Sequence, residues 1–161
     1  MAFLALASVL ALAGCAELEQ LAPTQAPASG VDGEQAIVTR VIDGDTIDVR
    51  LNDQTERVRY IGINSPEREE ACYSAATAAN AALVQGQQVT LVRDVNETDT
   101  YGRLLRYVYV GDVFVNGELV ADGYAESRAY PPDTRQQIYL DSLERAAKAA
   151  GRGCHPTGVF D

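Results

Sequence analysis

Histidine and lysine are almost absent from this 161-residue sequence, which contains one of each, His155 and Lys148. A single histidine excludes a histidine-based metal finger and leaves no partner for a histidine general-base pair. The G-x-S-x-G pattern of a serine-hydrolase nucleophile turn does not occur. These absences remove several common hydrolase classes, and we find no internal repeat that would predict a repeat architecture.

Positive charge is also scarce, because 13 basic residues face 23 acidic ones and give a formal net charge of −10. This balance argues against a general binder of polyanions, but not against an enzyme that gathers a few cations at one cleft. All the basic residues except Lys148 are arginine, which suits bidentate recognition of phosphate. An arginine bias that follows genome composition explains the count equally well.

The one long apolar run lies at the N-terminus, in MAFLALASVLALAGC, residues 1–15. The run is too short to span a membrane comfortably and is typical of a signal peptide. The alternative is an N-terminal core helix, but the run has neither a capping residue nor a polar face. Its end resembles the lipobox of bacterial lipoproteins, in which the cysteine, here Cys15, is lipidated. We expect a lipid anchor in the cell envelope, a flexible tether over residues 16–35 and a folded domain over residues 36–161.

Two cysteines remain for the folded part, Cys72 and Cys154, and an even pair in an oxidising compartment predicts a disulfide. Neither belongs to a C-x-x-C pair, so a structural metal site is the weaker alternative.

The hydrophobic pattern after residue 35 predicts five short strands and three helices. β-branched segments with turn residues between them indicate strands at 36–42, 46–51, 56–63, 87–95 and 102–115. Helices are expected at 70–86, at 116–124 with Asn116 as its first residue, and at 133–153 with Ile138, Leu140 and Leu143 on its apolar face. The pattern favours the α+β class, with a five-stranded OB-fold-type β-barrel and about three helices.

Three segments contain candidate catalytic or binding residues. Asp43-Gly44-Asp45 is a turn with one acid more than a turn requires. Arg59 precedes the loop residues Asn64, Ser65 and Glu67, and Asp99, Tyr101 and Arg103 surround a glycine. Taken singly, each has an ordinary alternative: a turn, a solvated arginine, a helix start with Ser65 as its cap, or a hairpin.

Taken in order, the blocks VIDGDT, VRYIGINSPE and TDTYGRLL, with the tail NGELVADGYAESRAYPPDT, resemble the staphylococcal nuclease (thermonuclease) family. The family comprises calcium-dependent phosphodiesterases on an OB barrel, and the resemblance spans about residues 36–154. It implies that Asp45 is the main calcium carboxylate, that Asp43 supports the metal through water, and that Asn64 and the Ser65 carbonyl complete the site. Calcium suits such oxygen ligands.

The resemblance also implies that Arg59 and Arg103 hold the scissile phosphate while Glu67 activates water and the 5′ oxygen leaves. Tyr101, Arg128 and Tyr130 are the implied substrate-binding residues. Three positions depart from the family pattern: Asn64 stands for an aspartate, Thr100 for a basic residue, and Arg128 for a tyrosine.

We therefore expect a monomeric, lipid-anchored, calcium-dependent nuclease that cuts DNA and RNA with little sequence preference. The alternatives are a weak or inactive nuclease-like domain that binds single-stranded nucleic acid or another envelope ligand, and a purely structural lipoprotein. The presence of Asp45, Arg59, Glu67 and Arg103 together favours the enzyme.

Overall fold

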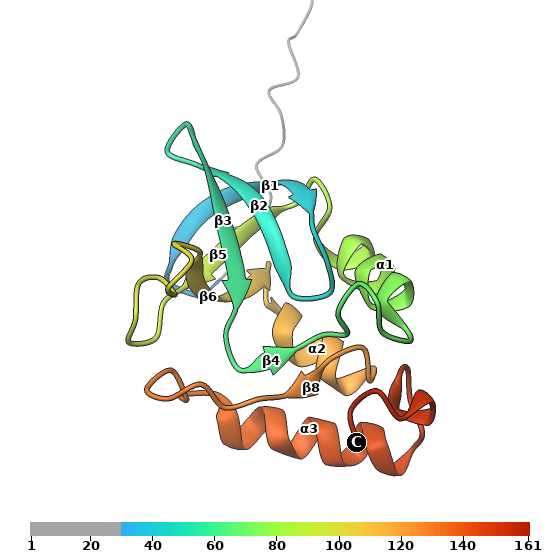
Figure 1. Cartoon of the computed structure of the whole chain (residues 1–161). Helices are drawn as coiled ribbons and strands as arrows, with labels where there is room; N and C mark the ends of the chain where they lie inside the picture. The colour runs from blue at the N-terminus through green and yellow to red at the C-terminus, as the bar shows by residue number, and fades with distance from the viewer. Residues whose placement is uncertain (1–29) are drawn as a thin grey trace, which may run out of the picture.

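A computed structural model describes residues 30–161 and shows a closed β-barrel flanked by helices (Figure 1). Its five long strands are β1 (Glu34–Val41), β2 (Thr46–Leu51), β3 (Gln54–Tyr60), β5 (Gln88–Val92) and β6 (Leu104–Val110). Neighbours in the order β3-β2-β1-β5-β6 are antiparallel, and a parallel β3–β6 pairing closes the barrel. The predicted α+β class and five-stranded barrel are confirmed.

Shorter elements complete the fold. They are β4 (Ile63–Asn64), β7 (Val113–Phe114), β8 (Glu126–Ser127), the helices α1 (Tyr73–Val84), α2 (Val115–Ala121) and α3 (Gln137–Ala149), and the 3-10 turn η1 (His155–Thr157). β4 pairs with β8, and β7 pairs with β6. α2 lies between the barrel and α3, and α1 lies beside the turn between β1 and β2 (Figure 1).

The barrel forms because its strands alternate between core and outside. Ile47, Val49 and Val58 are fully buried in the core with residues from every other long strand. The two-residue turn between β2 and β3 is Asn52-Asp53, and both residues have positive φ, 48° and 62°. A two-residue turn with positive φ at both positions matches the right-handed twist of the flanking strands, and Asn and Asp tolerate positive φ. The hairpin was therefore predictable from sequence.

Two expectations for the helices were wrong in detail. Asn116 does not begin α2, because the helix starts at Val115 and the Asn116 side chain is fully buried. Its amide accepts the Val108 N–H at 2.9 Å and donates to the Ile61 carbonyl at 2.9 Å, so it ties α2 to the barrel. Ile138 is 87% exposed, because it precedes the buried Leu140 by two residues and therefore lies on the opposite side of α3.

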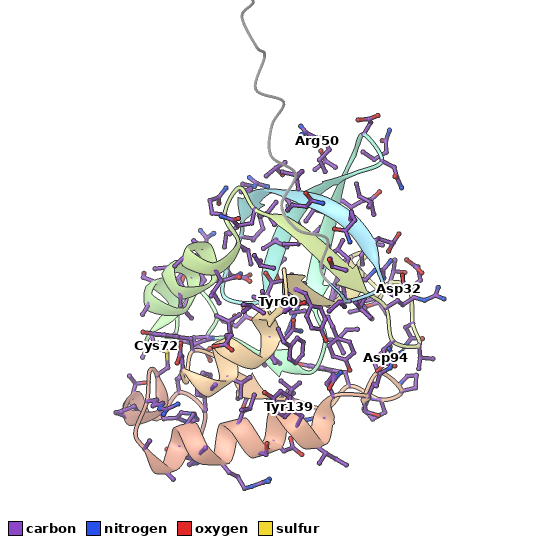
Figure 2. The ribbon with its side chains drawn as sticks, turned by 180° about the vertical axis from the view of Figure 1, so that it is seen from behind. Asp32, Arg50, Tyr60, Cys72, Asp94 and Tyr139 are labelled. Atoms are coloured by element: carbon purple, nitrogen blue, oxygen red, sulfur yellow. A yellow bond between two sulfur atoms is a disulfide. The ribbon has the colours of Figure 1, made fainter. Side chains whose placement is uncertain are left out.

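The predicted disulfide is present, joining Cys72 before α1 to Cys154 near the C-terminus with 5.7 Å between their Cα atoms (Figure 2). It fixes the start of α1 against the C-terminal turn, far from it in sequence.

The predicted signal peptide and lipidated Cys15 lie outside the described residues, as does most of the predicted tether. β1 begins at Glu34, two residues before the expected domain boundary, and Glu34 and Gln35 pair with Leu91 and Thr90 of β5. Among the helices of residues 30–161, none is long and apolar enough to cross a membrane.

Candidate active site

The acidic turn between β1 and β2 packs against the loop after β4 and against α1. A Cβ atom on Gly44 would lie 2.6 Å from the Ser65 Cβ and 3.1 Å from the Ala76 Cβ. Only glycine permits this close approach. On the α1 side, the buried Asn80 donates its Nδ2 hydrogen to the Asp43 carbonyl at 2.8 Å. The sequence Asp-Gly-Asp thus holds two carboxylates beside the loop that carries Asn64 and Ser65.

Asp45 is the buried member of the turn, with 5% of its surface exposed. One carboxylate oxygen accepts the Ser65 N–H at 2.7 Å, and the other accepts the Thr46 hydroxyl at 3.1 Å. The Arg59 guanidinium pairs with the same carboxylate at 3.2 Å. A buried charge with several polar partners is well positioned to bind a cation or to hold an arginine.

Asp43 lies next to this charge and is partly buried. Burial raises the pKa of the Asp43 carboxyl, and the negative charge of Asp45 raises it further. Its Oδ1 also accepts the Asp45 backbone N–H at 3.1 Å. Two like charges held this close are stabilised by any cation that binds between or beside them.

Arg59, on β3, links the acidic turn to the loop. Its side chain is 12% exposed, and Nη1 donates to the carbonyls of Tyr60 at 2.7 Å and Ile63 at 3.0 Å. Nη2 faces Asn64 Oδ1 at 3.4 Å, and the guanidinium lies 5.9 Å from the centre of the Tyr130 ring. These contacts fix the guanidinium in one orientation before any substrate arrives.

Asn64 is oriented by a residue that the sequence analysis did not single out, Glu126. β4 and β8 pair Asn64 with Glu126, and Asn64 Nδ2 donates to a Glu126 carboxylate oxygen at 3.1 Å. The same oxygen accepts from Arg128 at 2.9 Å. The amide oxygen of Asn64 therefore faces Arg59, which itself pairs with Asp45 of the acidic turn. Glu126 lies inside the tail AESRAY, but nothing in the sequence pairs it with Asn64.

Arg103 sits at the end of a tight loop shaped by Asp99. The Asp99 carboxylate accepts the backbone N–H groups of Tyr101 and Arg103 at 2.9 Å and 3.0 Å. It also accepts the Arg103 Nε hydrogen at 2.6 Å, and the guanidinium lies over the Tyr101 ring at 5.4 Å. Tyr101 itself is 84% exposed, as befits a stacking surface for a base.

Four of the predicted site residues line one cavity of about 310 Å³. They are Arg59, Tyr101, Arg103 and Tyr130, and Thr100 lines it too. Two arginines and two aromatic rings facing one cavity can bind a phosphate and an adjoining base.

Glu67, Arg128 and the four candidate metal ligands do not line this cavity; the ligands are Asp43, Asp45, Asn64 and Ser65. Glu67 is exposed in the turn before α1, where its backbone N–H donates to Glu70 at 2.7 Å. Its carboxylate makes no hydrogen bond or ion pair with any residue of the described chain. Arg128 is exposed and paired with Glu126.

The candidate metal ligands are oxygen donors, which fits a hard cation such as calcium. They are the carboxylates of Asp43 and Asp45, the amide oxygen of Asn64 and the carbonyl of Ser65. Within residues 30–161, no group of three or more acidic, histidine or cysteine side chains could hold a metal ion. At this site only two acidic side chains come together, Asp43 and Asp45, because residue 64 is an asparagine.

Comparison with known proteins agrees with this geometry. The family model described as "Staphylococcal nuclease homologue" matches residues 57–154. A thermonuclease of Staphylococcus intermedius is 35% identical over 132 residues, which cover 78% of this chain and 79% of that protein. A thermonuclease of Staphylococcus hyicus is 34% identical over 70% of this chain and 69% of its own length. A micrococcal nuclease of Shigella flexneri is 35% identical over 74% of this chain and 73% of its own length.

Proposed function

The chain belongs to the staphylococcal nuclease family and is a nuclease, and we propose that it is a calcium-dependent phosphodiesterase acting on both DNA and RNA. The observation that carries the proposal is the convergence of Arg59 and Arg103 on one cavity, with the buried Asp45 in contact with Arg59. Low sequence preference follows because the cavity offers arginines and aromatic faces, which recognise phosphate and any base alike.

Asp45, Asp43, the Asn64 amide oxygen and the Ser65 carbonyl would hold the calcium ion. When bound, calcium would supply positive charge beside the phosphate that is cut. The other roles belong to side chains of the protein.

Arg59 and Arg103 bind the non-bridging oxygens of the scissile phosphate. Each is already held by an aspartate, Asp45 or Asp99, so neither must be ordered when the substrate binds. As water attacks phosphorus, negative charge grows on these oxygens and both guanidiniums stabilise it. The bond between water oxygen and phosphorus forms as the bond to the 5′ oxygen breaks, and the 5′ oxygen takes a proton from solvent and leaves as a hydroxyl.

Glu67 accepts the proton of the attacking water in this proposal. It lies in the exposed turn that follows the ligand residue Ser65 by two positions, so a bound substrate can reach its carboxylate. Its place outside the cavity also supports a second candidate, a domain that binds single-stranded nucleic acid and cuts it poorly.

We further propose that the protein is exported and held in the cell envelope by a lipid on Cys15. The apolar run that ends in Leu-Ala-Gly-Cys supports this location, as does the disulfide, which is favoured in an oxidising compartment.

The test uses the full chain, in detergent, with single-stranded DNA or RNA in excess calcium or in EDTA. We expect both nucleic acids to be cut only with calcium. Arg103→Ala should lower kcat by about 10²–10³-fold, as for the removal of an oxyanion donor, with little change in melting temperature. Glu67→Gln should also lower kcat, and Arg145→Ala on α3 is the matched control for removal of an exposed arginine.

A folded wild-type chain that binds single-stranded DNA but does not cut it at high calcium would establish the second candidate instead. If the melting temperature of Arg103→Ala fell in step with its activity, Arg103 would be structural.

A further inference from the structure

Two arginines flank one aspartate on the outer face of the barrel, outside the site described above. Arg40 on β1 and Arg57 on β3 are the cross-strand partners of Asp48 on β2. Arg40 donates from Nε and Nη2 to one Asp48 oxygen at 3.0 Å and 2.7 Å. Arg57 donates from Nε at 2.8 Å and from Nη2 at 3.3 Å.

This cluster carries more positive charge than the fold needs. Asp48 is 6% exposed, and one arginine would neutralise it. The second leaves a surplus of one positive charge on a chain whose net charge is −10. Each arginine keeps its Nη1 group without a hydrogen bond to the described residues, and the two side chains are 64% and 45% exposed. One ion pair already neutralises Asp48, so charge balance in the fold does not require the second arginine.

The surplus charge lines a groove that adjoins the active-site cavity. Arg40, Asp48 and Arg57 line a groove of about 520 Å³ together with Tyr101 and Arg103. Tyr101 and Arg103 also line the cavity, so the two hollows share a wall. Along β3, Arg57 and Arg59 project from the same face, two residues or about 7 Å apart. Arg57 is thus the next basic group on β3 after the arginine that holds the scissile phosphate.

We propose that Arg40 and Arg57 bind a second phosphodiester of the substrate strand, next to the one that is cut. The inference rests on the proposed nuclease function and adds a binding subsite to it. The two free Nη1 groups can hold phosphate oxygens. Tyr101 stands between the two phosphates and can stack on the base there. The subsite would take a single strand longer than a dinucleotide.

The test compares two substrates with the full chain in calcium: a thymidine dinucleotide with one phosphodiester bond, and a thymidine octanucleotide. The variants are Arg40→Gln, Arg57→Gln and their combination. Arg145→Gln on α3, across the molecule from the β2–β3 hairpin, is the matched control for charge (Figure 1). The double variant should raise the KM of the octanucleotide several-fold more than that of the dinucleotide. The salt dependence of the octanucleotide KM should weaken by about 0.7 in logarithmic slope for each phosphate that the variant no longer binds.

Asp48→Asn separates binding from folding, because it keeps both arginines but breaks both of their ion pairs. We expect its octanucleotide KM to be equal to or below that of the wild type. The inference is overturned if Asp48→Asn raises this KM as much as the double arginine variant does. It is also overturned if the arginine variants affect both substrates equally while the wild type cuts both. A wild type that cuts neither substrate would refute the proposed function itself and the inference with it.

Discussion

At the scale of single residues, the negative charge expected at position 64 stands instead on the neighbouring strand. The family pattern has an aspartate where this chain has Asn64, and β8 places the carboxylate of Glu126 directly opposite. The amide donates to that carboxylate and turns its own oxygen toward Arg59. Glu126 therefore positions Asn64, while the acidic turn would supply the charge for the proposed calcium ion.

This arrangement predicts that restoring the aspartate alone helps little. Asn64→Asp removes the Nδ2 donor and sets two carboxylates against each other across a strand pair, which is destabilising. Adding Glu126→Gln returns a donor to the pair and leaves the new charge free to face the acidic turn. We expect the double variant to reach half-saturation at lower calcium than the wild type, measured by the calcium-dependent rise in melting temperature.

Glu126→Gln alone is the control, and Asn64→Asp alone should melt below the wild type without calcium. Equal calcium midpoints for the wild type and the double variant would show that residue 64 does not contact the ion.

The same pair shows why part of the site could not be predicted from sequence. Asp43 and Asp45 lie in the turn just before β2, and Arg59 lies on β3, which forms a hairpin with β2, so local patterns already placed them near one another. The Asn64–Glu126 contact joins two-residue strands that are 62 positions apart, and no periodicity marks such short strands. The groove lined by Arg40 and Arg57 was missed for a similar reason, because it depends on the register of three strands.

At the scale of elements, the sequence revealed those that form through local interactions. The β2–β3 hairpin follows from Asn52-Asp53, whereas the parallel β3–β6 pairing that closes the barrel joins segments with no local signal. The expected start of α2 was assigned from Asn116 as a capping residue. The Asn116 side chain instead forms hydrogen bonds with backbone groups of Val108 and Ile61, and not with those of its own helix. Tertiary hydrogen bonding overrode the local capping preference at this position.

The disulfide is the element-scale feature with the largest predicted effect on stability. Cys72 and Cys154 are 82 residues apart, and closing such a loop stabilises the fold by up to roughly 4–5 kcal/mol in the chain-entropy model. Cys72→Ser with Cys154→Ser should lower the free energy of unfolding toward that limit, measured by urea denaturation. Neither cysteine lines the cavity, so nuclease activity well below the melting temperature should persist.

Wild-type protein treated with a reductant is the control, and it should unfold at the same urea concentration as the double serine variant. Unchanged midpoints in both cases would mean that the bridge adds no stability.

At the scale of the whole molecule, the excess of acid is balanced in part by arginine pairing. Hydrogen bonds from Arg57 lower the pKa of Asp48, with Arg40 adding to the effect, and hydrogen bonds from Arg106 and Arg93 lower the pKa of Glu97. Arg106 is itself 1% exposed and bridges Glu97 and Glu34. Paired carboxylates of this kind make the stability of the folded chain depend on their remaining ionised.

Asp48 allows this dependence to be measured with its sign. Its folded pKa is lowered, so its contribution to stability is complete above the unfolded value of about 3.9 and is lost as pH falls through the folded value. The difference in unfolding free energy between the wild type and Asp48→Asn should therefore be larger at pH 6 than near pH 2.5, measured by urea denaturation at both. Replacing both partners, Arg40→Gln with Arg57→Gln, should also make the free energy of unfolding fall less between pH 6 and pH 2.5. The reason is that the double variant lacks the donors that lower the pKa of Asp48. A difference that stays constant with pH would show that Asp48 titrates alike in the folded and unfolded chains, and that its ion pairs do not contribute to the stability of the barrel.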